Sequence, residues 1–400
     1  MSHRLNLNGA ATAADPAASF ASLVVKHDQQ HEALERLKFL LNHGVGYELI
    51  CLVGPTGVGK STLAARLMKD LLAAEQSQMM CDREFVPFIS TTAVASGFRA
   101  FDWKVLYHDA LLALGDPFVD DRRPTPEARE QQHKRVGESL TAATLRLRLG
   151  REMQRRRLKY WFIDEAQHIL MGARAGGIGD QYDVLKSVAQ SCGVKLVLVG
   201  TYQLLVHLQV SAQLARRTEV VHFGRYRHGD AEDRNAFASC VQTFLSRIGA
   251  EVFPNVEAEF DFFYAGSVGC VGILKDWCAR AMSRARMEAR SRLTIEDFRR
   301  TRLAGLAIQR IVKDIHDGED LASPDTDRRI EAMVLGSPAP VGPLRRIASM
   351  VLGTPASGSS SKTSKEGSGK GGRPGKVGVR SPTRDAVPPV AGGLSGGDHA

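Results

Sequence analysis

The stretch GPTGVGKS, Gly54 to Ser61, lies directly after the apolar run YELICLVG and directly before the helical pattern STLAARLMKDLLAA. It matches the eight-residue phosphate-loop pattern, whose glycines let backbone N–H groups wrap phosphates at a helix N-terminus. Among 38 glycines in 400 residues a chance match arises on the order of a few per cent of the time, and the strand–loop–helix context lowers that figure. The stretch therefore predicts a nucleotide site. The expected contacts are Gly54, Pro55, Thr56, Gly57, Val58, Gly59, Lys60, Ser61 and Thr62, with Lys60 on the β and γ phosphates and Ser61 on Mg²⁺.

Helical and strand patterns alternate on both sides of this loop. Amphipathic stretches predict helices at 31–44, 61–74 and 180–193, and apolar runs predict strands at 47–54, 84–90, 159–164, 194–200 and 218–224. Four of the strands are unbroken apolar runs, which is typical of a parallel sheet covered on both faces. The predicted fold class is α/β, a three-layer α/β/α P-loop NTPase domain.

After about residue 228 the pattern changes to helices without strands, expected at 230–249, 268–287 and 294–315. The last of these opens at Thr294, with Glu296 and Asp297 in its first turn. Beyond Ser337 the chain is rich in Gly, Ser and Pro and predominantly cationic, which predicts a disordered basic tail. We predict a flexible N-terminal arm (1–24), a nucleotide-binding domain (25–228), a small helical lid domain (229–318), and a linker and tail (319–400).

The composition narrows the class of partner. A formal charge of +9 and a pI near 9.3 favour a polyanionic partner. Six cysteines are scattered without CxxC pairs, as in a reduced, cytoplasmic protein, and His168 has no matching ligand cluster that would make it a metal ligand. No signal peptide is evident and the apolar runs are too short to span a membrane, so we expect a cytoplasmic protein without a membrane partner.

The stretch YWFIDEAQHIL, Tyr160 to Leu170, delivers an acidic pair to the C-terminal edge of the expected sheet. Asp164 is predicted to make a second magnesium contact, and Glu165 to polarise the attacking water as a general base. The alternative is an acidic helix N-terminus after a strand. DEAQH also resembles a helicase box, but a helicase of that type needs two tandem α/β domains. The C-terminal part here is short and helical, so we reject that function.

Two further features point to the same edge or to a neighbouring subunit. The strand VKLVLVG is followed by Thr201, which could contact the γ-phosphate or the attacking water; the alternative is a Thr that caps the next helix. Arg216 and Arg217 stand at the end of a short helix before an edge strand, where a guanidinium could reach the nucleotide of an adjacent subunit. A solvated pair of surface arginines is the alternative.

Together, the phosphate loop, DEAQH, LVLVGT, QLARR and GSVGCVGILKDW resemble the AAA+ ATPases that regulate transposition, the TniB and TnsC family, with the bacteriophage Mu B protein more distantly related. The resemblance covers roughly residues 25 to 310. It implies ATP and Mg²⁺ as cofactors, and a homo-oligomeric ring or helical filament on double-stranded DNA. It also implies recruitment of a transposase, a TniQ- or TnsD-like target-selector partner, a bacterial cytoplasmic location, and slow, assembly-dependent ATP hydrolysis that dismantles the assembly.

The resemblance also implies roles for single residues. Lys60 and Ser61 take the phosphate and metal roles, Asp164 the metal role, Glu165 the base, Thr201 the sensor role and Arg217 the finger. Thr218 stands where the family often has an aromatic residue, which leaves the choice between Arg216 and Arg217 open. Arg99, Lys104, Thr91 and Thr92 are the candidate DNA contacts, and Lys275 is a candidate nucleotide contact near the second sensor position. Two other functions fit the same motifs: a signalling or defence NTPase that gates an effector, and a DNA-binding scaffold that hydrolyses little ATP.

Overall fold

A computed structural model describes residues 20, 23, 25, 27–95, 101–116, 141–170, 178–208, 216–248, 259–290, 292–322, 331–332 and 334–336. All of these lie within one unit of the chain, Met1–Gly353. The candidate DNA contact Arg99, most of the predicted N-terminal arm and the predicted basic tail lie outside the described residues. None of the described helices is long and apolar enough to cross a membrane.

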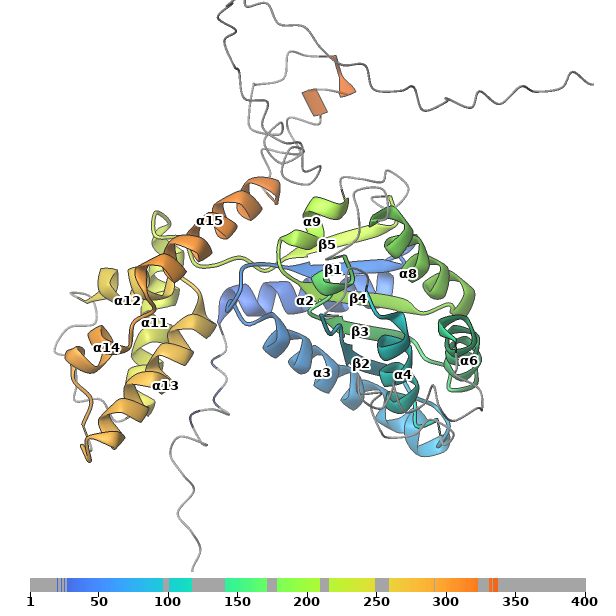
Figure 1. Cartoon of the computed structure of the whole chain (residues 1–400), viewed down its shortest axis with the longest axis horizontal. Coiled ribbons are helices and arrows are strands. Elements are labelled where there is room, and N and C mark those ends of the chain that lie inside the picture. The colour runs from blue at the N-terminus through green and yellow to red at the C-terminus, as the bar shows by residue number, and fades with distance from the viewer. Residues whose placement is uncertain are drawn as a thin grey trace, which may run out of the picture. The chain divides into compact units, whose positions relative to one another are not determined.

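Five parallel strands form one sheet in the order β2-β3-β4-β1-β5 (Figure 1). The strands are β1 (Leu49–Val53), β2 (Phe88–Thr92), β3 (Tyr160–Asp164), β4 (Lys195–Gly200) and β5 (Thr218–His222). All five follow from their apolar runs, but β2 begins four residues later than predicted. The preceding Pro87 has no N–H to donate to a ladder, and its carbonyl already accepts from the backbones of Lys159 and Tyr160, at 3.1 Å in each case. The parallel α/β fold is confirmed.

Side chains alternate between the two faces of the sheet, as the period of two in a strand requires. Ile50 and Leu52 of β1 pack with the helices α2 (Asp28–His43) and α3 (Lys60–Cys81). Cys51 and Val53 pack on the opposite face with α4 (Trp103–Ala113), α6 (Ala142–Arg155), α8 (Ile178–Cys192) and α9 (Gln203–Leu208). A short helix, α7 (Gln167–Leu170), follows β3. These two helical layers with the sheet between them are the expected three-layer arrangement, a P-loop NTPase fold (Figure 1).

The C-terminal helical part consists of α11 (Ala231–Arg247), α12 (Phe260–Ser267), α13 (Val271–Met287), α14 (Ile295–Thr301) and α15 (Gly305–Leu321). Its core is aromatic, with Phe263, Trp277 and Phe298 fully buried against one another. The helix predicted at 268–287 begins only at Val271, because Val268 and Gly269 adopt left-handed φ angles of 57° and 73°.

The single helix predicted at 294–315 is wrong: α14 and α15 are separate, and Arg302 and Ala304 between them are extended, with ψ of 147° and 145°. Side chains of α13 bind the last carbonyls of α14, since Trp277 Nε1 donates to Phe298 O at 2.9 Å and Arg280 Nε donates to Thr301 O at 3.1 Å. Because those carbonyls are satisfied from outside, the helix ends there without a backbone continuation.

Candidate functional site

The phosphate loop connects the end of β1 to the start of α3. Gly57 and Gly59 have φ of +76° and +112°, a left-handed conformation that glycine adopts without steric cost. A side chain at Gly54 would lie 2.0 Å from the carbonyl oxygen of Phe223, so the loop can pass β5 only with glycine there. Gly59 is the N-cap of α3, and the free N–H groups of the first helical turn, which includes the exposed Ser61, form an anion-binding end.

Lys60 is the first residue of α3, and its side chain folds back over the loop. Its Nζ donates to Gly54 O at 3.0 Å and to Pro55 O at 2.8 Å. Burial lowers the pKa of Lys60 to about 8, an effect that the charges of Glu165, and more weakly of Asp164, oppose. The ammonium group therefore lies within electrostatic reach of the acidic pair that sequence reasoning assigned to the same site.

The acidic pair leaves the sheet at the end of β3. Asp164 stands in register beside Thr92 of β2, and its Oδ1 accepts from the backbone N of Glu165 at 2.8 Å. Glu165 has a φ of +52°, which is strained for a residue with a side chain. The next N–H, of Ala166, donates to Val199 O at 2.9 Å, so the segment stays attached to β4 while the chain turns. The structure thus places Asp164 and Glu165 at the C-terminal edge of the sheet. The phosphate loop, which follows β1, lies at the same edge.

Thr201 follows β4 at the same edge, because Gly200 is in register with Val53, the last residue of β1. Its hydroxyl oxygen is buried, and no atom of the described residues forms a hydrogen bond with it. The alternative that this hydroxyl caps the next helix is therefore wrong. A buried polar atom without a partner is rare in folded proteins, and at such a site it is a ready contact for a bound polar group.

Gln167 is a site residue that sequence reasoning missed. Its side-chain amide donates to Glu165 Oε2, and its Oε1 accepts from Thr201 N at 3.2 Å. The amide thus joins the ends of β3 and β4. The only sequence signal is its place two residues after Glu165; the bridge itself depends on the position of β4.

Arg216 and Arg217 precede β5 and therefore lie at the N-terminal edge of the sheet, opposite the phosphate loop. Strands of five residues separate the two edges by about 16 Å. Arg217 NH1 contacts Glu48 Oε1 at 2.6 Å. Arg216 is exposed, and no described residue makes a hydrogen bond or ion pair with its side chain. The structure therefore separates both arginines from the other candidates, and of the two only Arg217 has a side-chain partner among the described residues.

The described candidate DNA contacts divide into one buried residue and two exposed ones. Thr91 is only 6% exposed, and its hydroxyl accepts from Nε1 of the buried Trp161 at 2.9 Å, so it belongs to the core and not to a surface. Thr92 and Lys104 are exposed. Lys104 lies in the first turn of α4, where its backbone N donates to the N-cap Asp102 at 3.0 Å. Only these two of the described candidates are accessible to DNA.

The start of α13 rests directly on the phosphate loop. Ile273 N donates to Gly57 O at 3.1 Å, and a side chain at Gly272 would lie 2.4 Å from the same carbonyl oxygen. Lys275 is half-buried and lies one turn after Gly272, on the same side of the helix. Burial lowers the pKa of Lys275, and the charge of Asp276 opposes that effect. The helical part thus reaches the nucleotide site through backbone contacts.

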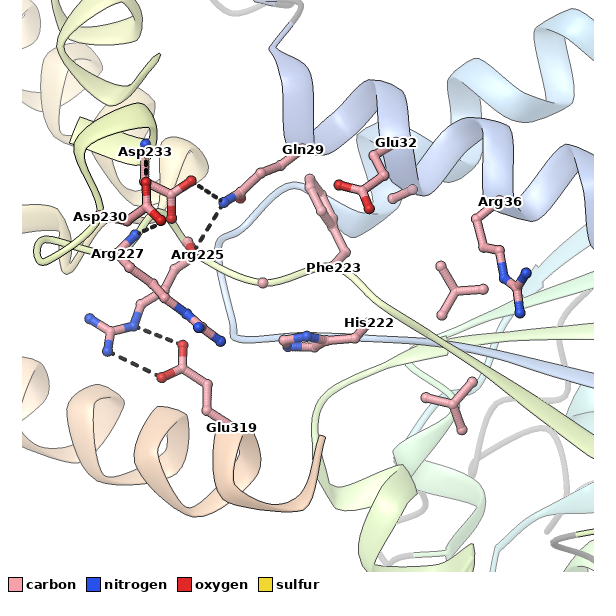
Figure 2. A pocket seen from close by; sticks show the side chains of 14 residues that line it. Gln29, Glu32, Arg36, His222, Phe223, Arg225, Arg227, Asp230, Asp233 and Glu319 are labelled. Carbon is pink, nitrogen blue, oxygen red and sulfur yellow. Dashed lines mark hydrogen bonds and ion pairs between the residues drawn. The ribbon is translucent and has the colours of Figure 1, made fainter. Parts of the chain in front are cut away.

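A cavity of about 360 Å³ lies where α2, the segment after β5 and the helical part meet. Figure 2 shows two contacts between its lining side chains: Arg225 makes two hydrogen bonds to Glu319 of α15, at 3.0 and 3.2 Å, and Gln29 of α2 donates to Asp233 of α11 at 3.0 Å. The residues that line the cavity do not include the phosphate loop. This cavity, which sequence reasoning did not find, marks the junction that attaches α11 and α15 to the α/β layers.

The residues at the C-terminal edge of the sheet fit a magnesium-bound nucleoside triphosphate. The first turn of α3 and Lys60 supply N–H donors and a cation, Ser61 and Asp164 supply the oxygen ligands that Mg²⁺ prefers, and the unpartnered hydroxyl of Thr201 is a donor without an acceptor. None of the described residues forms a separate cluster of metal-ligating side chains.

Comparisons with known proteins agree with this fold. Residues 29–208 match the family model described as an AAA domain. This stretch is therefore an AAA-type P-loop ATPase domain. The narrower TniB and TnsC resemblance stays a prediction. No curated protein matches the chain.

Solved structures with a similar fold include two from Aeropyrum pernix. The ORC2 protein has 16% identity and a TM-score of 0.46, with 68% of this chain and 66% of that one covered. The ORC1 protein, solved with DNA, has 16% identity and a TM-score of 0.48, with 69% and 65% covered. A Walker-type ATPase of Pyrococcus abyssi has 15% identity and a TM-score of 0.46, with 81% and 88% covered.

Proposed function

We propose that the chain is an ATP-dependent AAA+ regulator of DNA transposition, which assembles on double-stranded target DNA, recruits a transposase and disassembles when it hydrolyses ATP. In this proposal Lys60 and the first turn of α3 hold the triphosphate, and Ser61 and Asp164 hold Mg²⁺. When bound, Mg²⁺ would neutralise negative charge on the triphosphate. The catalytic group is Glu165.

The chemistry assigned to the protein is proton transfer and charge stabilisation. The Glu165 carboxylate accepts a proton from the attacking water, and the Thr201 hydroxyl donates a hydrogen bond to an oxygen of the γ-phosphate. The unpartnered state of that hydroxyl supports this role, because a γ-phosphate oxygen would satisfy it. An arginine next to the γ-phosphate would stabilise the charge that develops there.

The observation that carries the proposal is the separation of the arginines from the rest of the site. Arg216 stands about 16 Å along the sheet from the phosphate loop of its own chain, beyond the reach of its side chain. An arginine in that position can complete only the site of a neighbouring copy. Hydrolysis then requires a head-to-tail assembly, which closes into a ring or extends as a filament.

Two features support double-stranded DNA as the partner of this assembly. The net charge of +9 favours a polyanion, Lys104 and Thr92 are exposed, and Thr92 pairs in register with Asp164 at the C-terminal edge of the sheet. Contacts from these residues would go to phosphates and be nearly independent of sequence. The transposase and the TniQ- or TnsD-like target selector are proposed from the resemblance of the motifs to the TniB and TnsC family.

A complementation experiment tests the shared site. Lys60→Ala should abolish nucleotide binding, and Arg216→Ala should bind nucleotide but not hydrolyse it. Mixed in equal amounts on duplex DNA, the two inactive variants should recover up to about a quarter of wild-type turnover, since half the sites bind ATP and half of those face an intact arginine. The double variant is the control and should stay inactive alone. Wild-type turnover by Arg216→Ala would exclude Arg216 from the site.

DNA binding is tested by fluorescence anisotropy with a labelled duplex and a non-hydrolysable ATP analogue. We expect binding only with nucleotide, and we expect Lys104→Ala to reduce the slope of log affinity against log salt by about 1. Negative-stain images under the same conditions should show rings or filaments. Equal DNA binding without nucleotide, or by Lys60→Ala, would remove ATP as the assembly switch and favour an NTPase that acts on another partner.

A further inference from the structure

Gln167 connects two functional strands through a single buried side chain. It is 5% exposed and begins α7, directly after the turn that carries Glu165. One end of its amide donates to the carboxylate of Glu165, and the other end accepts from the backbone N of Thr201 at 3.2 Å. Both ends of a buried amide must be satisfied, and here the two partners are the proposed base and the proposed phosphate sensor.

The surroundings leave this amide little freedom. A side chain at Gly200 would lie 2.4 Å from Gln167 Oε1, so the bridge to Thr201 exists only because residue 200 is glycine. On the same segment, Ala166 N donates to Val199 O at 2.9 Å. The ends of β3 and β4 are therefore held together by one backbone bond and one side-chain bridge, and a shift of either end must move the other.

We infer that Gln167 is a positioning residue, which sets the place of the Glu165 carboxylate according to the position of Thr201. The amide donates to one oxygen of Glu165 and leaves the other oxygen for the attacking water. It also keeps Glu165 in its strained backbone conformation, φ +52°. A phosphate that contacts the Thr201 hydroxyl thereby fixes the base in the same step. This inference rests on the roles proposed above for Glu165 and Thr201.

Two substitutions separate this role from simple packing. Gln167→Met keeps the length and apolar stem of the side chain but loses both hydrogen bonds. Gln167→Glu is isosteric and can still accept from Thr201 N, but it cannot donate to an ionised Glu165. Both should lower kcat by about 10- to 100-fold, the usual cost of losing an orienting partner of a catalytic group, and leave KM for ATP within about twofold.

The coupling to Glu165 has its own measurement. Glu165→Gln, Gln167→Met and the double variant form a cycle, with ATP turnover on duplex DNA as the readout. If Gln167 acts through Glu165, Gln167→Met should change the kcat of Glu165→Gln by less than about twofold. Gln154→Ala is the matched control, because Gln154 donates from α6 to the backbone of Ser191, away from the site, and should keep wild-type turnover.

The outcomes distinguish the two proposals. If Glu165→Gln hydrolyses ATP like the wild type, or if the wild type hydrolyses none, the proposed base is wrong and the inference fails with it. If Glu165→Gln is inactive but Gln167→Met and Gln167→Glu keep wild-type kcat, only the inference is overturned. Losses that add in the double variant, or a rise in KM with constant kcat, would also overturn it. Should Gln167→Met fail to fold, the isosteric Gln167→Glu tests the inference by the same criterion, a lower kcat with an unchanged KM for ATP.

Discussion

Thr201→Val should raise stability and lower activity at the same time. The Thr201 hydroxyl is buried without a hydrogen-bond partner among the described residues. An unpaired buried hydroxyl costs about 1–3 kcal/mol, and valine has nearly the same shape without it. We therefore expect the free energy of unfolding of the nucleotide-free protein to rise by about 1 kcal/mol. Turnover should fall about 100-fold, because a donor to the developing phosphate charge is lost.

Urea unfolding without nucleotide and steady-state ATP turnover on DNA measure the two effects. Thr91→Val is the matched control, for which we expect a change in stability of the opposite sign. It removes the acceptor of the buried Trp161 Nε1 and should destabilise the protein by about 1–3 kcal/mol. A loss of stability in Thr201→Val would contradict the unpaired state of the hydroxyl, and unchanged turnover would exclude Thr201 from the catalytic site.

Three further results are expected. ATP affinity should weaken as the pH rises through about 8, by up to about tenfold per unit, because burial lowers the pKa of Lys60 to about 8 and only the charged ammonium attracts phosphate. Titration with a fluorescent ATP analogue at pH 7 and 9 measures this, and the same dependence in Lys60→Arg would assign it to another group. Gly318→Ala should destabilise the protein by about 1–3 kcal/mol, since its new methyl would lie 2.0 Å from a tyrosine ring, whereas Gly305→Ala in the same helix meets nothing within 4 Å and should not. The urea concentrations at the midpoint of unfolding measure this difference, and equal midpoints for the two variants would contradict the close contact at Gly318. Arg217→Ala should lose at most about 1 kcal/mol with its ion pair and keep DNA-stimulated turnover, while Arg216→Ala should lose turnover at unchanged stability; the reverse result would make Arg217 the trans-acting residue.

The main features of the fold could be predicted because they depend on local pattern. The apolar runs gave the strands, the phosphate loop identified the strand next to it, and a parallel sheet brings the residues after each strand to one edge. The break between α14 and α15 could not be predicted in this way. It depends on Trp277 and Arg280, which lie about twenty residues earlier and bind the last carbonyls of α14.

The site shows the same limit. Thr91 and Thr92 are adjacent in one strand, so they must face opposite sides, and only the packing of β2 shows which one faces the core: the Thr91 hydroxyl accepts from the buried Trp161. Arg216 and Arg217 are equivalent in sequence and differ only because Glu48, on the neighbouring strand segment, binds one of them. Gln167 could not be recognised, because its partner Thr201 is distant in sequence.

The contacts that leave the phosphate loop explain how one bound nucleotide could control an assembly. Ile273 N donates to Gly57 O, and Gly272 lies close against the same carbonyl group, so the backbone of α13 contacts the backbone of the loop directly. Gln167 joins the ends of β3 and β4 with equally little freedom. Packed backbones and buried bridges transmit a displacement where long exposed side chains would absorb it. A phosphate that moves the loop must therefore also move α13, and with it the helical part. We expect ATP to change the orientation of that part and, through it, the surface offered to the next copy.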